Sequence, residues 1–422
     1  MHMERADQDG FNRNGQKAKS ASRQLAVASA TVKNQALQAI AQALIQQTQT
    51  ILQANARDLE AAQNSGMKQS LQDRLLLDEK RIRGIADGVL QVAAQPDPIG
   101  EVLEGFTRPN GLQIRKIAVP LGVIGIIFEA RPNVTVDAAT LCLKSGNATI
   151  LRGGKEAFYS NQALAEIMRG ALEQSGLPAD CIQLVQDTSR ASATALMQLN
   201  GYLDVLIPRG GAGLIQAVVQ NATVPVIETG TGNCHIYIDE SADLEMAARI
   251  VENAKTQRPS VCNACESLLV HSAVAAQALP KIQALLEQHH VEIRGCDRTK
   301  NILGDCVVPA TEKDYATEFL DYIIAVKVVD NLEQAIDHIM HYTSGHSECI
   351  VTKDLRSAEK FTANVDAAAV YVNASTRFTD GGEFGFGAEI GISTQKLHAR
   401  GPMGLKQLTS VKYVVYGQGQ IR

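Results

Sequence analysis

The chain has 422 residues, of which 45% are hydrophobic and 20% are charged, and its formal net charge is -5. This length predicts two or three domains, and the composition excludes a disordered chain. Because no stretch is strongly basic, neither nucleic acid nor an anionic membrane is expected as a partner. No apolar run is long enough to cross a bilayer, and the polar residues 1–16 do not resemble a signal peptide, so we expect a cytoplasmic protein.

Helices are predicted for the first part of the chain. Apolar residues at positions i, i+3, i+4 and i+7 from Leu37 form one stripe in a helical region at 17–64, and Gly66 is typical of a helix end. Residues 112–119 then predict one strand of a pair, which stops before Pro120.

Short apolar runs then alternate with amphipathic stretches in two series. The first series predicts strands at Val123–Phe128, Ala148–Leu151, Ile182–Val185, Val205–Ile207 and Val224–Ile227, and helices at 134–145, 159–175, 190–199 and 212–220. The second predicts strands at His235–Ile238, Ser267–Val270, Ile323–Val328, Glu348–Thr352 and Ala369–Val372, and helices at 243–256, 273–287, 331–342 and 354–363. This alternation is typical of parallel strands covered by helices on both faces, which bind ligands at the carboxyl ends of the strands.

The fold class is therefore α/β, with two doubly wound domains and a small β element. The predicted bounds are 1–104 with 120–232 for the first domain, 233–395 for the second, and 105–119 with 396–422 for the β element. The last segment, Val411–Tyr416, is rich in β-forming residues and has no evident partner strand, so we expect it to pair with another subunit of a homo-oligomer.

Two of the eight cysteines stand in a polar context, and the apolar setting of most of the others favours thiols in a reducing compartment. Cys262 and Cys265 lie in a loop that begins with Arg258. A thiolate near positive charge is a strong nucleophile, although a buried loop cysteine is the plainer alternative. A Cys-x-x-Cys pair also suggests zinc, but no second pair supplies the two further ligands, so no metal is predicted.

Polar residues follow several of the predicted strands. Asn133 comes at the turn after Val123–Phe128, where its amide can donate to an oxyanion or simply cap a helix. Glu228 ends the run Val224–Ile227, where a carboxylate can act as a general base or cap a loop.

Cations and glycines follow two other strands of the same series. Arg152 and Lys155 can hold a phosphate such as the 2'-phosphate of NADP, or they are solvated surface charges. The turn Arg209-Gly210-Gly211 lets a pyrophosphate approach the backbone, although its spacing matches neither G-x-G-x-x-G nor a P-loop. With Cys262 across the predicted domain boundary, this distribution predicts a cofactor cleft between two domains.

Three segments together resemble the aldehyde dehydrogenase superfamily, and most closely its branch that reduces L-glutamyl 5-phosphate. They are Phe128–Ala139 (FEARPNVTVDAA), Gln257–Asn263 (QRPSVCN) and Val372–Thr394 (VNASTRFTDGGEFGFGAEIGIST). The resemblance runs in consistent order from about residue 17 to the C-terminus. It implies an NADPH-binding first domain, a catalytic second domain and an oligomerisation role for the small β element.

The resemblance also implies roles for single residues. Cys262 stands at the catalytic nucleophile, and Asn133 stands at the amide that helps to hold the oxyanion. Arg152 and Lys155 match positions beside the adenosine ribose, where a base in place of the usual acid at the Lys155 position favours NADP. Glu318 lies near the glutamate that holds the nicotinamide ribose.

Other implied roles concern the pyrophosphate and the substrate. Arg209, Gly210 and Gly211 match the turn near the pyrophosphate. Glu228 matches the general base of hydrolytic members, but the surrounding Glu-Leu-Gly-Gly pattern reads Glu-Thr-Gly-Thr-Gly, so Glu228 is assigned to the cofactor site. The third signature and a nearby histidine suggest candidates for the α-amino and α-carboxylate groups of the substrate, namely Ser375, Arg377 and His346.

The implied reaction is an NADPH-dependent reduction of L-glutamyl 5-phosphate to L-glutamate 5-semialdehyde and phosphate through a thioester on Cys262. This is the second step of proline biosynthesis, and the labile substrate makes glutamate 5-kinase the expected working partner. A hydrolytic NAD(P)-dependent aldehyde dehydrogenase with Glu228 as base is the first alternative. A non-catalytic binding protein on the same fold is the second.

Overall fold

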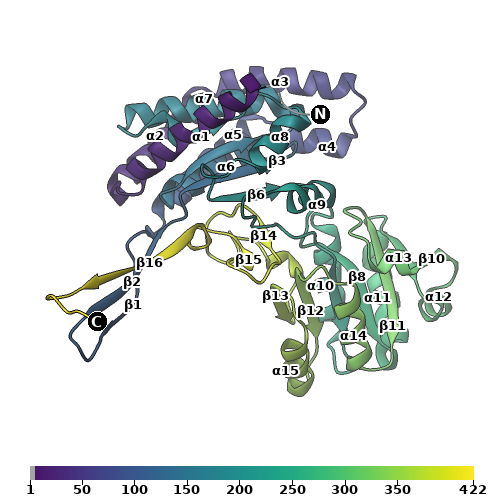
Figure 1. The fold of residues 1–422 in the computed structure, drawn as a ribbon. Helices are drawn as coiled ribbons and strands as arrows, with labels where there is room; N and C mark the ends of the chain where they lie inside the picture. Colours follow the sequence, from purple (N-terminus) through teal and green to yellow (C-terminus); the bar gives the residue numbers. More distant parts are fainter. Residues whose placement is uncertain (1–4) are drawn as a thin grey trace. The chain divides into compact units, whose positions relative to one another are not determined.

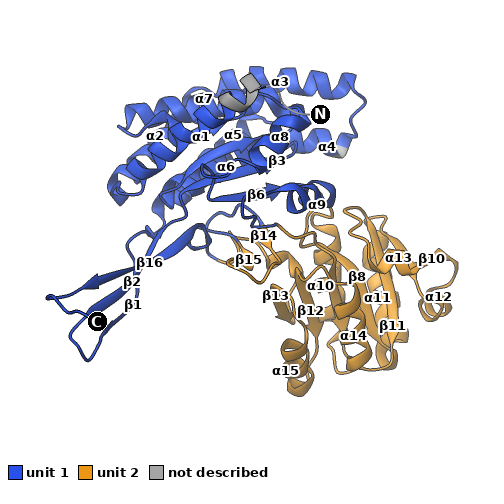
Figure 2. Cartoon of the chain, in the orientation of Figure 1, with its two compact units in different colours: residues 1–228, 385–391, 403–422 blue, residues 229–384, 392–402 orange. Residues whose placement is uncertain are grey.

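The computed structural model describes residues 5–422, so residues 1–4 of the predicted first domain lie outside the described part. The chain divides into two compact units, which Figure 2 shows in separate colours. Unit 1 comprises the described residues up to Glu228 together with 385–391 and 403–422, and unit 2 comprises 229–384 and 392–402. The division thus falls close to the predicted boundary after residue 232, while residues 385–391 belong to unit 1 instead of the second domain.

Five helices open unit 1, and the predicted helical region at 17–64 falls within the first three (Figure 1). Their bounds are Arg5–Leu25 (α1), Ala30–Gln46 (α2), Thr48–Asn64 (α3), Gln69–Leu75 (α4) and Glu79–Ala94 (α5). The apolar stripe that begins at Leu37 is fully buried on α2, and the side chain of Ser29 caps that helix. Gly66 follows α3 with a φ of 71°, a left-handed conformation that favours glycine at a helix end.

A parallel four-stranded sheet forms the core of unit 1, as the first series of apolar runs predicts. Its order is β5-β4-β3-β6, with bounds Val123–Phe128 (β3), Ala148–Arg152 (β4), Ile182–Leu184 (β5) and Val205–Arg209 (β6). The helices of the series are Pro132–Lys144 (α6), Phe158–Gln174 (α7), Arg190–Met197 (α8) and Ala212–Asn221 (α9). All six residues of β3 are buried, which is typical of a parallel strand covered on both faces.

The predicted strand Val224–Ile227 is not formed, and this expectation was wrong. Only a single bridge joins Val226 to Leu206 of β6. Pro225 explains the difference, because proline has no N–H with which to extend a ladder of hydrogen bonds.

A three-stranded antiparallel sheet, called the β ribbon below, completes unit 1. Its order is β1-β2-β16, with bounds Val102–Thr107 (β1), Gln113–Pro120 (β2) and Thr409–Tyr416 (β16). The strand expected at 112–119 is confirmed as β2. The C-terminal strand, expected to lack a partner in its own chain, pairs along its whole length with β2, from Thr409 opposite Pro120 to Tyr416 opposite Gln113. Sequence reasoning missed this pairing because the partners lie some three hundred residues apart.

Unit 2 contains a seven-stranded parallel sheet with helices on both faces. Its order is β10-β9-β11-β8-β7-β12-β13. The strands are Cys234–Ile238 (β7), Cys265–His271 (β8), Glu292–Gly295 (β9), Val307–Pro309 (β10), Ile323–Val329 (β11), Ser347–Val351 (β12) and Ala369–Val372 (β13). The helices are Leu244–Thr256 (α10), Ser272–Glu287 (α11), Asp297–Leu303 (α12), Glu312–Tyr315 (α13), Leu332–Tyr342 (α14) and Leu355–Asn364 (α15).

All strands and helices predicted for the second series are present in unit 2, and the sequence missed β9, β10, α12 and α13. Helices α10 to α12 pack on one face of the sheet, and α14 and α15 pack on the other. Two short strands, Ile392–Ser393 (β14) and Gly401–Pro402 (β15), pair with each other. No helix among residues 5–422 is both long enough and apolar enough to cross a membrane.

Candidate active site

Cys262 lies in the loop that joins α10 to β8 in unit 2, and its side chain is half-buried. The thiol of Cys234 donates a hydrogen bond to the carbonyl oxygen of Cys262 at 3.2 Å. Gly232 lies against the same carbonyl, because a Cβ atom added to it would stand 1.5 Å from that oxygen. The chain that leads into β7 therefore fixes one side of the loop.

The other side of the loop is held through Asn263, the residue after the cysteine. Thr376, in a 3₁₀ turn at Thr376–Phe378, donates from Oγ1 to the carbonyl oxygen of Asn263 at 2.8 Å. Asn263 Nδ2 donates to the carbonyls of Arg377 and Thr379 at 3.2 and 3.0 Å. Arg377 returns a hydrogen bond from Nη1 to Asn263 Oδ1, and its Nε donates to Gln257 Oε1 at 3.1 Å. Fixed backbone on both sides is what a positioned nucleophile requires.

The other residues predicted for unit 2 contact groups that hold this loop in place. Glu318 Oε1 accepts the backbone N–H of Gly232 at 2.7 Å, so it supports the segment that touches Cys262. His346 is fully buried, with Nδ1 3.7 Å from the sulfur of Cys234. Ser375 Oγ accepts the backbone N–H of Arg377 at 3.3 Å and so caps the 3₁₀ turn.

The neighbouring thiols differ from Cys262 in accessibility. Cys234 and Cys265 are fully buried, and burial raises the pKa of each thiol well above its usual value. Cys265 also points its sulfur along its own strand, toward the carbonyl oxygen of Ser267 at 3.3 Å. Cys262 is therefore the accessible thiol of the Cys-x-x-Cys pair. Sequence reasoning missed Cys234 because its contact with the loop spans 28 residues.

In unit 1, the amide of Asn133 has a defined orientation. Asn133 is the second residue of α6 and lies within the helix, so it is not the N-cap, which is Arg131. Its Nδ2 donates to Asp137 Oδ2 at 2.9 Å, one helical turn further on. Burial raises the pKa of Asp137 to about 6, although the hydrogen bond from Asn133 and the charge of Arg209 act in the opposite direction. One amide hydrogen is thus committed to Asp137, and the other remains for a ligand.

The glycine turn after β6 forms the N-terminus of α9. Arg209 ends the strand, and Gly211 is the N-cap of the helix. The backbone N–H of Gly211 donates to Glu129 Oε2 at 3.0 Å, and a Cβ on Gly210 would stand 2.6 Å from the carboxyl carbon of Glu129. Both glycines therefore permit the close approach of an acidic group. Glu129 was missed at the sequence level because its partner lies 82 residues away.

Arg152, the last residue of β4, and Lys155, three residues later, are in different surroundings. Arg152 Nη2 donates to the carbonyls of Thr188 and Ser189 at 2.6 and 2.8 Å, and burial lowers the pKa of its guanidinium. Lys155 is the first residue of a 3₁₀ turn that follows β4, and its side chain is exposed. Arg152 thus supports the loop before α8, whereas Lys155 presents its charge to solvent. Glu228 is half-buried and is the last residue of unit 1 before the chain enters unit 2.

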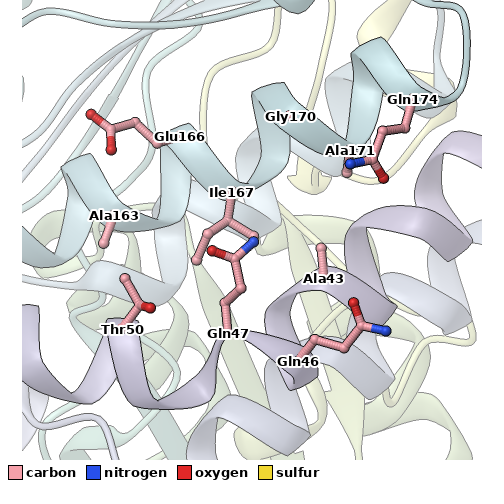
Figure 3. A pocket seen from close by; sticks show the side chains of 10 residues that line it. All are labelled: Ala43, Gln46, Gln47, Thr50, Ala163, Glu166, Ile167, Gly170, Ala171 and Gln174. Carbon is pink, nitrogen blue, oxygen red and sulfur yellow. The ribbon is translucent and has the colours of Figure 1, made fainter.

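A pocket of about 240 Å³ is found elsewhere in unit 1, where α7 faces α2 and the start of α3 (Figure 3). Glutamine side chains and small residues line it, and it contains none of the residues predicted for the site. Its lining residues are Ala43, Gln46, Gln47, Thr50, Ala163, Glu166, Ile167, Gly170, Ala171 and Gln174.

Comparison with known proteins gives a consistent result over nearly the whole chain. The sequence profile of the aldehyde dehydrogenase family matches residues 1–304 and 306–414. The gamma-glutamyl phosphate reductase of Heliobacterium modesticaldum is 61% identical over 408 residues, which cover 97% of this chain and 98% of the relative. That of Moorella thermoacetica is 62% identical over 408 residues, which cover 97% of each chain. The crystal structure of the Thermotoga maritima gamma-glutamyl phosphate reductase superposes with a TM-score of 0.95 at 51% identity, covering 98% of this chain and 99% of that one.

Proposed function

This chain belongs to the aldehyde dehydrogenase family and, within it, to the gamma-glutamyl phosphate reductases, and we propose that Cys262 carries the reaction. The protein is an oxidoreductase that reduces L-glutamyl 5-phosphate to L-glutamate 5-semialdehyde and phosphate in proline biosynthesis. The observation that supports Cys262 is the loop itself, which is held through Cys234 on one side and Asn263 on the other. An accessible thiol on a fixed backbone is suited to nucleophilic attack.

In the proposed mechanism, the sulfur of Cys262 attacks the acyl carbon of the substrate. Asn133 donates its remaining amide hydrogen to the oxygen that becomes negative, while Asp137 keeps that amide from rotating. The bond between the acyl carbon and the phosphate oxygen then breaks, which leaves a thioester on Cys262. A nicotinamide cofactor, when bound, would supply the hydride that reduces the thioester. Loss of the sulfur from the reduced carbon then releases the aldehyde and leaves a Cys262 thiolate, which takes a proton from solvent to restore the thiol.

Residues at the strand ends of unit 1 fit an anionic dinucleotide in most respects. The N-terminus of α9, the glycines before it and Arg209 favour negative charge. The Glu129 carboxylate, which now accepts the Gly211 N–H, has to turn away for a phosphate to use that donor. We propose NADPH as the preferred cofactor because the exposed Lys155 can pair with its 2'-phosphate, whereas Arg152 is committed to backbone carbonyls.

The hydrolytic alternative is not favoured, because the relatives of high identity are named as reductases of an acyl phosphate. In a phosphate-releasing reaction no water has to be activated, so Glu228 has no task as a general base. The non-catalytic alternative is equally disfavoured by the same relatives.

The lability of the substrate suggests how it is supplied. An acyl phosphate hydrolyses readily, so we propose that glutamate 5-kinase passes its product to this enzyme.

The β ribbon exposes apolar side chains on its outer strands, including Phe106, Tyr413 and Val415, and we propose that it joins subunits of a homo-oligomer. The thiol state of all eight cysteines supports a cytoplasmic location.

The proposed function is tested by running the reaction backwards with glutamate semialdehyde and NADP, with and without phosphate. Strict dependence of NADPH formation on phosphate is expected, and equal rates without phosphate would support hydrolysis instead. Cys262→Ala should abolish turnover, and Asn133→Ala should lower kcat by about two to three powers of ten. Full activity of Cys262→Ala would overturn the assignment of the nucleophile.

A further inference from the structure

The guanidinium of Arg377 bridges the two ends of the loop of residues 257–264, called the nucleophile loop because it carries the proposed nucleophile, Cys262. Its Nε donates to Gln257 at the start of the loop, and its Nη1 donates to Asn263 next to Cys262. The side chain is half-buried, so its charge is partly withdrawn from water beside the residue that follows Cys262.

A second arginine, Arg258, belongs to the same loop. Arg258 follows Gln257, the residue that Arg377 contacts, and is exposed. Burial first, and the positive charge of Arg258 second, lower the pKa of Arg377. Asp380 is the acidic residue whose charge favours Arg377, but its Oδ1 accepts the backbone N–H groups of Gly382 and Glu383.

Neither arginine forms an ion pair with a carboxylate among the residues that the structure describes. Most other arginines of unit 2 contrast with them, since Arg294, Arg298 and Arg400 are each paired with an acidic residue. Two like charges held together without a counter-ion cost stability unless a ligand supplies the negative charge.

We propose that Arg258 and Arg377 bind the phosphoryl group of the acyl phosphate, and inorganic phosphate when the reaction runs backwards. This inference rests on the proposed function. The phosphoryl group is joined through the bridging oxygen to the carbon that Cys262 attacks, so it has to lie beside the nucleophile loop. The α-carboxylate stands at the opposite end of the substrate. Paired guanidinium groups also suit a phosphate dianion better than a single carboxylate.

The two arginines would then promote one defined step. As the sulfur of Cys262 bonds to the acyl carbon, the bond from carbon to the bridging oxygen breaks and phosphate departs with the electron pair. The proton of the thiol ends on the phosphate, so the charge is balanced. Cations beside the bridging oxygen stabilise the negative charge that grows there in the transition state.

The experiment is the reverse reaction at varied inorganic phosphate, using the full-length chain with Arg258→Gln. The KM for phosphate should rise by about tenfold to a hundredfold, as expected for loss of a charged hydrogen-bond donor. The KM values for glutamate semialdehyde and NADP should stay unchanged. Arg258→Lys should retain much of the phosphate affinity, and Arg356→Gln, which removes another exposed charge of unit 2, should behave like the wild type.

The outcomes separate this inference from the proposed function. If the wild type needs no phosphate, the proposed function fails. If the wild type needs phosphate but Arg258→Gln has the wild-type KM for it, the phosphoryl site is overturned while the function stands. A rise in the KM for semialdehyde alone would assign the arginines to the α-carboxylate, which also overturns the site.

A second measurement does not depend on turnover. Inorganic phosphate should slow the alkylation of Cys262 by iodoacetamide in the wild type, read by mass spectrometry of the loop peptide. Arg258→Gln and Arg377→Gln should lose this protection, and sulfate serves to compare a second anion. Equal protection in both variants and the wild type would contradict the proposal even if Arg377→Gln disturbs the loop.

Discussion

At the scale of residues, the amide of Asn133 depends on the ionisation of Asp137. The carboxylate accepts the Asn133 N–H, and burial raises the pKa of Asp137 to about 6. Below this pH the protonated carboxyl can donate to the amide oxygen, so the amide can turn, and its second hydrogen would then be lost to the oxyanion that we propose it holds. We expect kcat/KM to fall as the pH drops through about 6.

The matching variant is Asp137→Asn, which should remove this acid limb from the pH profile of kcat/KM. Its activity at neutral pH should be about tenfold to a hundredfold lower, because the amide is no longer held in one orientation. Asp87→Asn, an exposed acid on α5, provides the control and should leave the profile unchanged. An acid limb near pH 6 that persists in Asp137→Asn would assign it to another group.

The cofactor preference is predicted to depend on Lys155. Lys155→Glu should raise the KM for NADPH and lower that for NADH, each by about tenfold, because a repulsive charge replaces an attractive one. Arg152→Met should behave differently. Since Arg152 supports the carbonyls of Thr188 and Ser189, its loss should weaken both cofactors to a similar degree and lower the Tm. An unchanged NADPH/NADH ratio in Lys155→Glu would contradict the assignment.

The candidate residues of the site could be proposed from the sequence, but the residues that they contact could not. Cys262 and Asn133 stand in local motifs that mark a loop nucleophile and a strand-end amide. Glu129 and Cys234 act through contacts that span 82 and 28 residues, and such contacts depend on which strands become neighbours. Arg377 was expected near the substrate, while its hydrogen bonds to the nucleophile loop follow only from the three-dimensional structure.

At the scale of elements, the segment before β7 acts as a support for the nucleophile loop. We predict that Gly232→Ala lowers kcat by about a hundredfold, because the added Cβ would stand 1.5 Å from the Cys262 carbonyl oxygen and has to displace the loop. Gly170→Ala on α7 is the control, since its Cβ meets nothing within 4 Å. It should be neutral or stabilise by about 0.5–1 kcal/mol. Wild-type kcat in Gly232→Ala would show that the loop tolerates displacement.

Elements were predictable where the apolar pattern is strong and local. The apolar sequences of β3 and β11 are enough to predict these strands. By contrast, Glu292–Gly295 has a polar sequence, and it forms a strand because it pairs with β10 and β11. Conversely, Val224–Ile227 has the composition of a strand, but Pro225 prevents a ladder. Whether each of these two segments forms a strand depends on its neighbouring strands and on the backbone N–H groups that it can donate, and composition alone reveals neither.

At the scale of the whole molecule, the stability of the fold is predicted to be sensitive to the loss of one partner of a buried ion pair in unit 2. Lys255 Nζ and Glu266 Oε2 are 2.5 Å apart, and both side chains are fully buried. Lys255→Met should reduce the free energy of unfolding by about 3–5 kcal/mol, because it leaves a buried carboxylate without its partner. Lys353→Met, which removes the exposed partner of Asp243, should cost less than about 1 kcal/mol in the same urea titration.

The pH dependence of this effect has a definite sign. Burial raises the pKa of Glu266 to about 7, so the folded state holds its proton more tightly than the unfolded state. The stability that comes from this tighter proton binding by Glu266 is fully present below the unfolded pKa of Glu266 and is lost as the pH rises through about 7. Removing Lys255 raises that pKa further, so the cost of Lys255→Met should be larger at pH 8 than at pH 5. A cost that is independent of pH would contradict this account.

The closure of the β ribbon by β16 has a consequence for how the protein is made. The ribosome releases β2, which ends at Pro120, long before its partner β16, which begins only at Thr409. At about 5–20 residues per second, the nascent chain carries β2 with an open edge for roughly 15–60 s. An open edge invites pairing with other chains. Synthesis of this enzyme should therefore depend on chaperones during elongation, and any transcript truncated before Thr409 should yield a product that aggregates.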